Sequence, residues 1–257
     1  MSVLPNLVII GAMKCGTSAL HGYLDRHPEI AMSKPKELNF FFGPGPHTGA
    51  GKRAVDDGTA PQDGWSLGNW HRGVAWYAQH FSAEVPVRGE SSPGYTSPDH
   101  LGVAERMAAV IPRARLIYMV RDPIERAVSQ YRHHRRDGTE RRLLSEALLD
   151  MQSQYVARSL YYRRVEPFLR HFPRNRIAIV AQEELASTRG RALGRLFNFL
   201  GVDDAFETED VGGRRRPPQG RAAGLSRDLI ERLSDLLAGD ADRLRELAGR
   251  DFPGWRL

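Results

Sequence analysis

The stretch Leu7-Val8-Ile9-Ile10-Gly11-Ala12-Met13-Lys14-Cys15-Gly16-Thr17-Ser18-Ala19-Leu20 decides how this chain begins to fold. Its first four residues are apolar and show no alternation, which is typical of a strand buried on both faces. A short turn that carries Lys14 follows, and a helix is predicted to begin at Thr17. The N–H groups of such a turn, the positive end of the helix and a lysine can together bind one anion. The sequence therefore predicts an anion-binding loop between a buried strand and a helix.

This loop differs from the Walker A motif in the position of its lysine. Walker A reads G-x-x-x-x-G-K-[ST], so its lysine directly follows the second glycine. Here Lys14 precedes Gly16 by two residues, and Thr17-Ser18 stand where Walker A has Lys-Ser/Thr. No clear Walker B aspartate is found either. An ordinary nucleoside triphosphatase is therefore not favoured, although a P-loop kinase or NTPase stays an alternative that Mg²⁺-dependent ATP turnover would support.

Length and composition are those of a globular protein. The 257 residues, of which 41% are hydrophobic and 26% charged, suffice for one large α/β domain, and we expect a single domain over residues 1–257. No apolar stretch approaches the ~20 residues of a membrane span, and no signal peptide is predicted. The one cysteine, Cys15, excludes an intramolecular disulfide and cysteine-based metal clusters, and it fits a reducing compartment. We expect a cytoplasmic protein with no metal cofactor and no membrane partner.

The charge balance leaves another class of function open. The formal net charge is +6, and the arginines are spread along the chain instead of forming one basic run interleaved with aromatic residues. We therefore expect no nucleic-acid partner. A basic nucleic-acid-binding module remains an alternative, whose binding would weaken steeply with salt and would not need Lys14.

Strand-like and helix-like segments alternate along the chain. Strands are predicted at 5–11, 86–90, 115–120 and 176–180, and helices at 17–27, 70–81, 99–110 (capped by Asp99), 123–134, 153–171 (kinked or broken near Pro167), 190–200 and 226–248. A long loop rich in glycine and proline is expected from Gly43 to Asn69. Such alternation is typical of a three-layer α/β fold with a mostly parallel central sheet. Ligands bind beyond the carboxyl ends of such strands, where Gly11, Glu90 and Arg121 fall.

Two segments in particular resemble a known family. The loop from Gly11 to Ser18 looks like the sulfate-binding loop of sulfotransferases that use 3′-phosphoadenosine 5′-phosphosulfate (PAPS), and Arg115 to Tyr131, RLIYMVRDPIERAVSQY, resembles their second signature. Further similarity, to the heparan sulfate branch, lies in His27-Pro28-Glu29-Ile30, Lys36-Glu37-Leu38-Asn39-Phe40-Phe41, Trp76-Tyr77, Gly89 to Tyr95, Tyr161, Phe172-Pro173 and Phe252-Pro253-Gly254-Trp255. The resemblance covers nearly the whole chain and implies the P-loop-like sulfotransferase fold.

The resemblance implies a donor-binding site for PAPS, which leaves as 3′-phosphoadenosine 5′-phosphate (PAP). Lys14 would neutralise the leaving phosphate, and Arg121 with Ser129 would hold the 3′-phosphate. The other donor-binding residues implied are Met13, Cys15, Gly16, Thr17, Ser18, Tyr161, Gly213, Arg214 and Arg215. A plain solvated basic loop around residues 212–217 is the alternative for the last three. No metal is implied.

The resemblance also implies an acceptor site. Glu37 stands where the family has its catalytic glutamate and would act as the general base, while Asn39 replaces a histidine of some relatives. Phe40, Ser91, Ser92, Pro93 and Tyr95 are predicted to bind the acceptor, although Tyr95 is as readily interpreted as a core tyrosine. Relatives often carry lysine in place of Ser91, which weakens the case for a heavily sulfated polysaccharide. We expect sulfation of a hydroxyl, or less readily an amine, on a carbohydrate or glycosylated small molecule. A catalytically silent relative that only binds the nucleotide is a further alternative.

Overall fold

The computed structural model describes residues 3–43, 68–208 and 224–257. Five strands form one sheet in the order β2-β3-β1-β4-β5. Their bounds are β1 Leu7–Gly11, β2 Ile30–Met32, β3 Val87–Ser91, β4 Arg115–Val120 and β5 Ile177–Ala181. All neighbouring pairs are parallel, so every strand ends at the same edge of the sheet. This confirms the predicted parallel α/β architecture.

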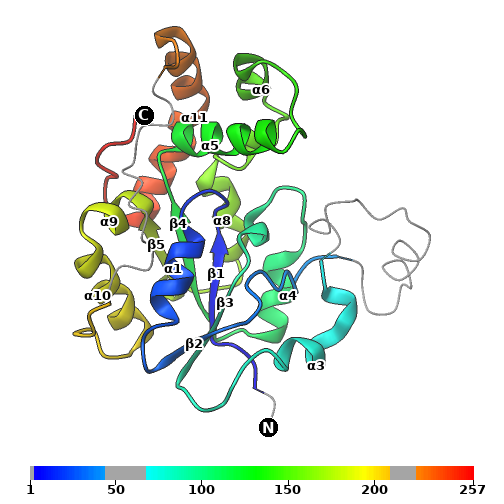
Figure 1. Cartoon of the computed structure of the whole chain (residues 1–257), viewed down its shortest axis with the longest axis vertical. Helices are drawn as coiled ribbons and strands as arrows, with labels where there is room; N and C mark the ends of the chain where they lie inside the picture. The colour runs from blue at the N-terminus through cyan, green and yellow to red at the C-terminus, as the bar shows by residue number, and fades with distance from the viewer. Residues whose placement is uncertain (1–2, 44–67, 209–223) are drawn as a thin grey trace.

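Helices cover both faces of this sheet and its upper edge. In Figure 1, α1 lies in front of the strands and α8 behind them, while α5 and α6 lie beyond the carboxyl ends of the strands. Their bounds are α1 Thr17–Leu24, α3 Gly73–Ala78, α4 Val103–Val110, α5 Pro123–Arg136, α6 Leu144–Leu149, α7 Gln154–Ala157, α8 Tyr161–Leu169, α9 Gln182–Ser187, α10 Arg189–Leu200 and α11 Arg227–Ala248, with short 3₁₀ helices η1 Trp70–Arg72, η2 Pro93–Thr96 and η3 Arg174–Arg176. Within these described ranges, none of the helices has the length and apolar character to cross a bilayer.

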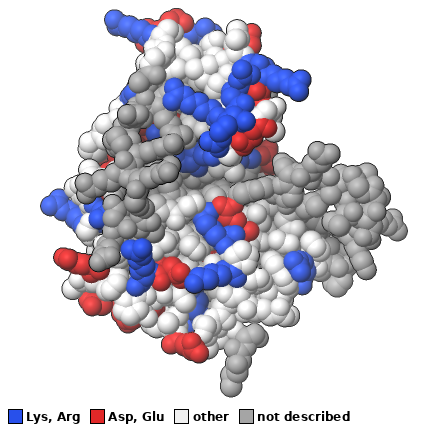
Figure 2. Space-filling model, in the orientation of Figure 1, with Lys and Arg blue, Asp and Glu red and all other residues white. Residues whose placement is uncertain are grey.

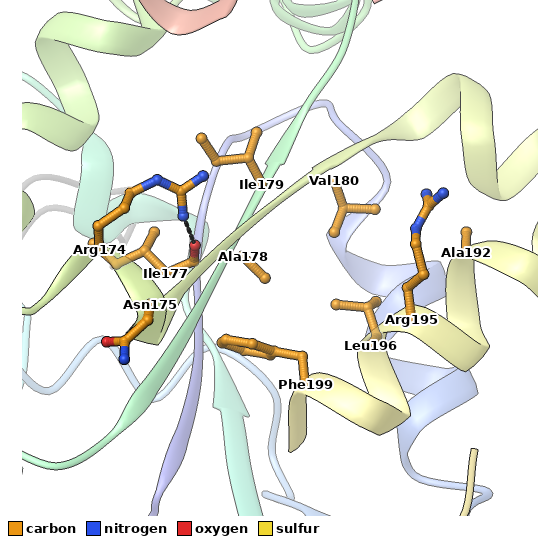
Figure 3. A pocket seen from close by; sticks show the side chains of 10 residues that line it. All are labelled: Arg174, Asn175, Ile177, Ala178, Ile179, Val180, Ala192, Arg195, Leu196 and Phe199. Carbon is orange, nitrogen blue, oxygen red and sulfur yellow. Dashed lines mark hydrogen bonds between the residues drawn. The ribbon is translucent and has the colours of Figure 1, made fainter. Parts of the chain in front are cut away.

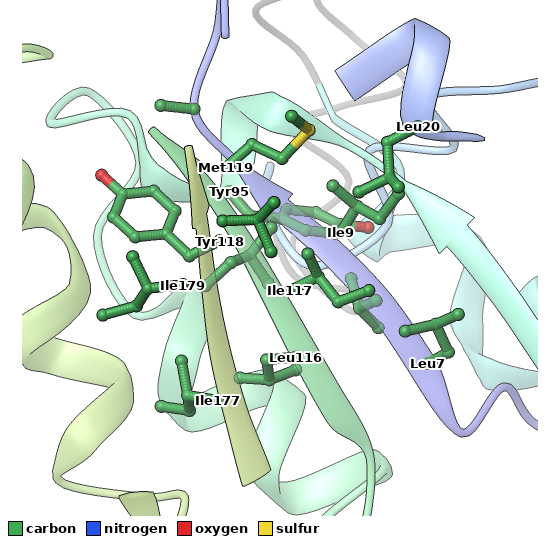
Figure 4. Packing of buried hydrophobic residues seen from close by; sticks show 14 of the residues in the cluster. Leu7, Ile9, Leu20, Tyr95, Leu116, Ile117, Tyr118, Met119, Ile177 and Ile179 are labelled. Carbon is green, nitrogen blue, oxygen red and sulfur yellow. The ribbon is translucent and has the colours of Figure 1, made fainter. Parts of the chain in front are cut away.

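The core lies between the sheet and the helices on its faces. Leu7, Ile9, Leu116 and Ile117 are fully buried and pack across the sheet as Figure 4 shows. Each such side chain contributes about 1.5–3 kcal/mol by leaving water. A continuous apolar run therefore places β1 and β4 in the centre of the sheet.

A second apolar cluster places α5 above the sheet. Ile124 and Val128 of α5 are fully buried with Tyr155 of α7 and Leu233 of α11. The opposite side of α5 is left to face the carboxyl ends of β1 and β4. This cluster therefore determines which way Ser129 and its neighbours on α5 are presented.

The predicted cap at Asp99 and a helix break at Pro167 are wrong. Asp99 does not cap a helix: α4 begins at Val103 after Gly102, which is left-handed with φ 74°, and the Asp99 carboxylate instead accepts a hydrogen bond from Ser97 (2.8 Å) and pairs with Arg158 (2.8 Å). Pro167 does not break its helix but lies inside α8. The break lies before Tyr161, where the Ser159 hydroxyl approaches the Tyr155 carbonyl oxygen at 2.9 Å.

Short elements escaped prediction for a simple reason. Strand β2 has three residues and helix α6 has six, too few for a period of two or 3.6 to be recognised. The predicted helix over 70–81 is divided into η1 and α3, because Gly73 adopts φ 77° between them.

We expect Gly11→Ala to destabilise the fold. A methyl group there would lie 2.1 Å from Thr96 Oγ1 and 3.1 Å from Tyr118 Cε2, inside a packed region. Overpacking of this kind costs about 1–3 kcal/mol of unfolding free energy. Urea unfolding followed by circular dichroism measures the loss.

The matched control is Gly190→Ala in α10, where a new Cβ meets nothing within 4 Å. This change should stabilise the protein by up to about 1 kcal/mol, because alanine favours a helix over glycine. Equal unfolding midpoints for Gly11→Ala and the wild type would show that the close approach to Thr96 is not a constraint.

Candidate functional site

The loop between β1 and α1, predicted to bind an anion, is tied to the neighbouring strand. Its Ala12 N–H donates to the Met119 carbonyl of β4 at 2.7 Å, which ties the loop to the neighbouring strand. Lys14 and Gly16 are left-handed, with φ 70° and 88°. Gly16 precedes α1 and has no side chain that could cap the helix. The first N–H groups of α1 can therefore donate to a ligand.

Tyr161 joins this loop to the end of β4. The Tyr161 hydroxyl donates to the Arg121 carbonyl oxygen (2.8 Å), accepts from the Arg121 N–H (3.3 Å) and lies 3.4 Å from Cys15 Sγ. Both Tyr161 and Cys15 are fully buried. Burial raises the pKa of the Cys15 thiol to about 11, so this thiol stays protonated at neutral pH. Tyr161 and Cys15 therefore lie behind the anion loop and support it.

Arg121 directly follows β4, and an ion pair with Glu125 orients its guanidinium. The two side chains pair at 3.1 Å, and the second Glu125 oxygen pairs with Arg256 at 3.1 Å. Asp122 caps α5 by accepting from the Glu125 N–H at 2.9 Å, as expected for an Asp-Pro helix start. Arg121 is only 8% exposed, so its position is fixed by the protein around it.

One cavity brings the main predicted donor-binding residues together. It has a volume of about 280 Å³ and lies at the carboxyl edge of the sheet. Lys14, Gly16, Arg121 and Ser129 line it, four residues that the family resemblance predicts to bind the two ends of one donor. The rest of its lining comprises Arg132, His133, Arg136 and Gln182. Figure 2 shows lysine and arginine side chains gathered on the upper part of this face, in the region of α5 in Figure 1.

Sequence reasoning missed the additional cations of this cavity. Arg132 and Arg136 follow Ser129 by three and seven residues on α5, which places them on the same side of the helix. That spacing is visible in the sequence, but the family resemblance points only to Arg121 and Ser129 in this part of the chain. His133 also lines the cavity, and burial, followed by the charge of Lys14, lowers its pKa. The cavity is thus more basic than the two predicted cations alone would make it.

A second loop, residues 36–40, lies beside the end of β3 and carries Glu37. The Glu37 N–H donates to the Ser91 carbonyl at 3.0 Å, and Glu37 pairs with the neighbouring Lys36 ammonium. The Glu37 loop follows β2 but lies against the end of β3, and the register pairs Ser91 of β3 with Ile9 of β1, the strand that leads into the Lys14 loop. Glu37 does not line the 280 Å³ cavity and belongs to the neighbouring part of the same sheet edge.

Backbone strain in the described residues is confined to these two loops. Apart from glycines, left-handed backbone occurs there at Lys14 (φ 70°), Glu37 (φ 69°) and Asn39 (φ 48°). Each such residue costs of order 1 kcal/mol or more and is found mostly where surrounding structure holds a functional side chain. All three are residues to which the sequence assigned a role.

The remaining predicted acceptor residues are buried. Phe40 and Ser91 are fully enclosed, and Phe40 stacks on Tyr77 with ring centroids 4.2 Å apart. Ser92, Pro93 and Tyr95 are likewise inside the protein. The structure therefore does not place these five side chains where an acceptor could touch them. Ser91, Ser92 and Tyr95 instead support the Glu37 loop by accepting hydrogen bonds from its amides. Asn39, two residues after Glu37, is half-buried.

The other predicted donor residues vary in their surroundings. Thr17 is buried and Ser18 exposed at the start of α1, while the Met13 sulfur lies 3.1 Å from Arg158 Nη1. Gly213, Arg214 and Arg215, and most of the 43–69 loop, lie outside the described residues. No grouping of three or more His, Cys, Asp or Glu side chains suited to a metal ion occurs among the described residues.

A cavity of about 270 Å³ lies elsewhere, between β5 and α10 (Figure 3). Arg174 and Arg195 flank an apolar floor that includes Ile179 and Phe199. The Arg174 guanidinium is occupied in capping the Ile177 carbonyl of the edge strand. This cavity contains none of the predicted site residues.

Comparison with known proteins agrees with this geometry. A sulfotransferase-family model matches residues 5–207. A crystal structure of a sulfotransferase from Alicyclobacillus acidocaldarius is 28% identical, with a TM-score of 0.74, and the match covers 99% of this chain and 100% of that one. A structure of a mouse sulfotransferase complexed with PAP is 14% identical, with a TM-score of 0.57, and shares the fold over 95% of this chain and 88% of that one.

Curated relatives are similar over nearly the same length of this chain. The bifunctional heparan sulfate N-deacetylase/N-sulfotransferase 2 of Homo sapiens is 27% identical over 98% of the chain, and the heparan sulfate glucosamine 3-O-sulfotransferase 3A1 of Mus musculus is 27% identical over 98% of it. The chain spans only 31% and 64% of the lengths of these two proteins.

Cys15 should resist alkylation in the folded protein. A pKa of about 11 in place of 9.0 lowers the share of reactive thiolate about 100-fold at pH 8, and burial hinders access further. Iodoacetamide labelling followed by intact mass should therefore be slow in buffer. Labelling of the unfolded chain in urea is the control and should be fast. Rapid labelling of the folded protein would contradict the closed junction between Cys15 and Tyr161.

Proposed function

The chain belongs to the sulfotransferase family, and on this premise we propose that it transfers a sulfuryl group from PAPS to a carbohydrate hydroxyl. One observation carries the proposal: Lys14, Arg121 and Ser129, from two segments over 100 residues apart, line one basic cavity. An in-line transfer needs an anionic donor held rigidly and charge stabilised on its leaving group. A cavity of this composition meets both needs.

The residues present fit the donor. PAPS carries negative charge at its 3′-phosphate and at its 5′-phosphosulfate, and the cavity offers Lys14, Arg121, Arg132 and Arg136. The Glu125 carboxylate pairs with both Arg121 and Arg256, so these three side chains together keep a net positive charge. Lys14 and the amides before α1 would hold the phosphosulfate end, and Arg121 with Ser129 the 3′-phosphate.

The chain's own groups then perform two tasks. PAPS supplies the sulfuryl group when bound. The Lys14 ammonium stabilises negative charge on the departing phosphate oxygen, and the Glu37 carboxylate takes the proton from the attacking hydroxyl. Lys36 pairs with Glu37 and so helps to hold its carboxylate in place.

A carbohydrate acceptor is supported by the relatives and by the Glu37 loop. Two of the relatives similar to this chain are named for modifying glucosamine or heparan sulfate. Ser91 is buried and bonded to His21 Nδ1 at 3.0 Å, so this position contributes no cation for a strongly acidic polymer. The acceptor is therefore a sugar of modest charge, sulfated on a hydroxyl or, as the second choice, on an amine.

The cytoplasm is the location that we propose. The one cysteine is a free, buried thiol, and proteins with free thiols are typical of reducing compartments.

Arg121→Ala should weaken PAP binding. Loss of a charge-assisted contact to the 3′-phosphate removes about 1.5–3 kcal/mol, which raises Kd about 10- to 100-fold. Calorimetric titration with PAP in the presence of EDTA measures the change. Arg170→Ala is the control, because Arg170 is 70% exposed and pairs only at 3.6 Å with Glu166.

Three outcomes separate the proposed function from its alternatives. Metal-independent PAP binding that Arg121→Ala weakens supports PAPS use. Equal affinity for ATP, with Mg²⁺-dependent turnover, would support the kinase or NTPase instead. Tight, salt-sensitive binding of single-stranded DNA without PAP binding would support the nucleic-acid module.

Glu37→Gln should abolish most turnover while it leaves the donor site intact. General-base catalysis contributes about 10²- to 10⁴-fold, so kcat should fall within that range. PAP affinity should stay unchanged, because Glu37 does not line the donor cavity. Transfer from radiolabelled PAPS to an unsulfated glucosamine-containing oligosaccharide measures kcat. Glu231→Gln, a surface change in a pair with Arg227, is the control, and wild-type turnover by Glu37→Gln would refute the base assignment.

A further inference from the structure

Glu90, at the end of β3, is a fully buried carboxylate that no step above uses. It accepts hydrogen bonds from three hydroxyls: Tyr77 (2.6 Å) and Tyr95 (2.7 Å) donate to Oε1, and Ser92 (2.7 Å) donates to Oε2. These distances are typical of hydroxyls that donate to an ionised carboxylate. Burial raises the pKa of Glu90, and the three hydroxyl donors oppose that shift.

Two of these hydroxyls also hold the Glu37 loop. The Ser92 hydroxyl oxygen accepts from the Asn39 N–H at 3.0 Å, and the Tyr95 hydroxyl oxygen accepts from the Phe40 N–H at 2.9 Å. Each hydroxyl has one proton to donate. Because that proton is committed to Glu90, the lone pairs of the oxygen are turned toward the loop amide.

Glu90 therefore determines the direction of both bonds to the loop. A carboxylate can only accept, so it forces Ser92 and Tyr95 to act as acceptors on their other side. Two loop amides, those of Asn39 and Phe40, depend on this arrangement. They lie at and directly after the left-handed Asn39, two residues beyond the left-handed Glu37, and such strained backbone needs contacts of this kind to persist.

We propose that Glu90 is a positioning residue for the acceptor side of the site: through Ser92 and Tyr95 it fixes the loop that presents Glu37. The effect on turnover rests on the proposed function, in which Glu37 is the base. The effect on the loop does not. Glu90 itself touches neither donor nor acceptor, because it is enclosed in the core.

The chain offers a matched pair of variants to test this inference. Tyr95→Phe and Tyr77→Phe each remove one buried hydroxyl that donates to the same Glu90 oxygen. Of these two tyrosine hydroxyls, the one of Tyr95 is also bonded to an amide of the loop, whereas the structure shows no such bond for Tyr77 among the described residues. Both rings remain in place, including the stack of Tyr77 on Phe40. The two variants thus lose the same bond to Glu90 and differ in the bond to the loop.

Hydrogen exchange tests the arrangement without any assumption about the reaction. In the full-length protein, Tyr95→Phe should speed exchange of the Phe40 amide about tenfold or more, since about 1.4 kcal/mol is a factor of ten and a buried bond contributes of that order. Ser92→Ala should do the same at Asn39, and Tyr77→Phe should change neither amide. Unchanged exchange in Tyr95→Phe and Ser92→Ala, or equal acceleration in Tyr77→Phe, would overturn the inference.

Kinetics then separate positioning from general destabilisation. Tyr95→Phe and Ser92→Ala should lower kcat about tenfold or more, because small misplacements of a catalytic group are costly. Their PAP affinity should equal that of the wild type, and Tyr77→Phe should keep kcat within about twofold by the same argument. Equal kcat in Tyr95→Phe and Tyr77→Phe would overturn the link to turnover.

Glu90→Gln provides a direct test of the carboxylate. The amide keeps the size of the side chain but exchanges an acceptor for a donor, so one hydroxyl must reverse its direction. Exchange at Asn39 or Phe40 should therefore accelerate, and wild-type exchange at both amides in the folded variant would contradict the proposal. If the wild type neither bound PAP nor used PAPS, the proposed function would fail while the exchange result still decided the role of Glu90.

Discussion

One hydroxyl holds together the two chain segments whose residues line the basic cavity. Tyr161 bonds to both backbone atoms of Arg121 and lies against Cys15, so it links the loop after β1 with the end of β4. Parallel strands bring these two segments to one edge, but the sheet alone leaves their relative position adjustable. The buried Tyr161 hydroxyl, in contact with the Arg121 carbonyl, the Arg121 N–H and the Cys15 sulfur, fixes the relative position of the two segments. Moving them apart would leave a buried polar group without a hydrogen bond. The cavity around Lys14 and Arg121 depends on this junction.

The acceptor side of the edge is organised by the same physical device. Glu90 orients buried hydroxyls toward the Glu37 loop, as the Arg121 carbonyl orients the hydroxyl of Tyr161. In both places a fixed acceptor takes the hydroxyl proton, and the oxygen then receives a backbone N–H. Buried hydrogen bonds with a defined direction limit how far a loop can move. Donor and acceptor loops are thus held independently, each by its own buried group.

Much of this arrangement could be predicted from the sequence, and the reasons are specific. Uninterrupted apolar runs mark β1 and β4, and parallel pairing then puts Lys14 and Arg121 at one edge. Ser129 follows because a helix starting at Pro123 keeps it near Arg121. The roles of Phe40 and Tyr95 are harder to predict from the sequence. A residue next to a catalytic position in the sequence can contact the substrate, or it can support the catalytic residue from the core, as these two buried residues do. Whether a serine such as Ser159 ends a helix depends on tertiary partners, which spacing does not reveal.

The left-handed residues explain why the exact form of the site lay beyond sequence reasoning. A glycine in the sequence often indicates a left-handed backbone, but Lys14, Glu37 and Asn39 adopt this conformation although they are not glycines. Their local preference is overruled by contacts made elsewhere: the Ser91 carbonyl and the Ser92 hydroxyl hold the Glu37 loop. Strain that is stabilised from outside can occur only where the surrounding core is rigid. In this protein it falls on the anion loop and on the Glu37 loop, so the fold concentrates its least favourable backbone on the side chains assigned to the chemistry.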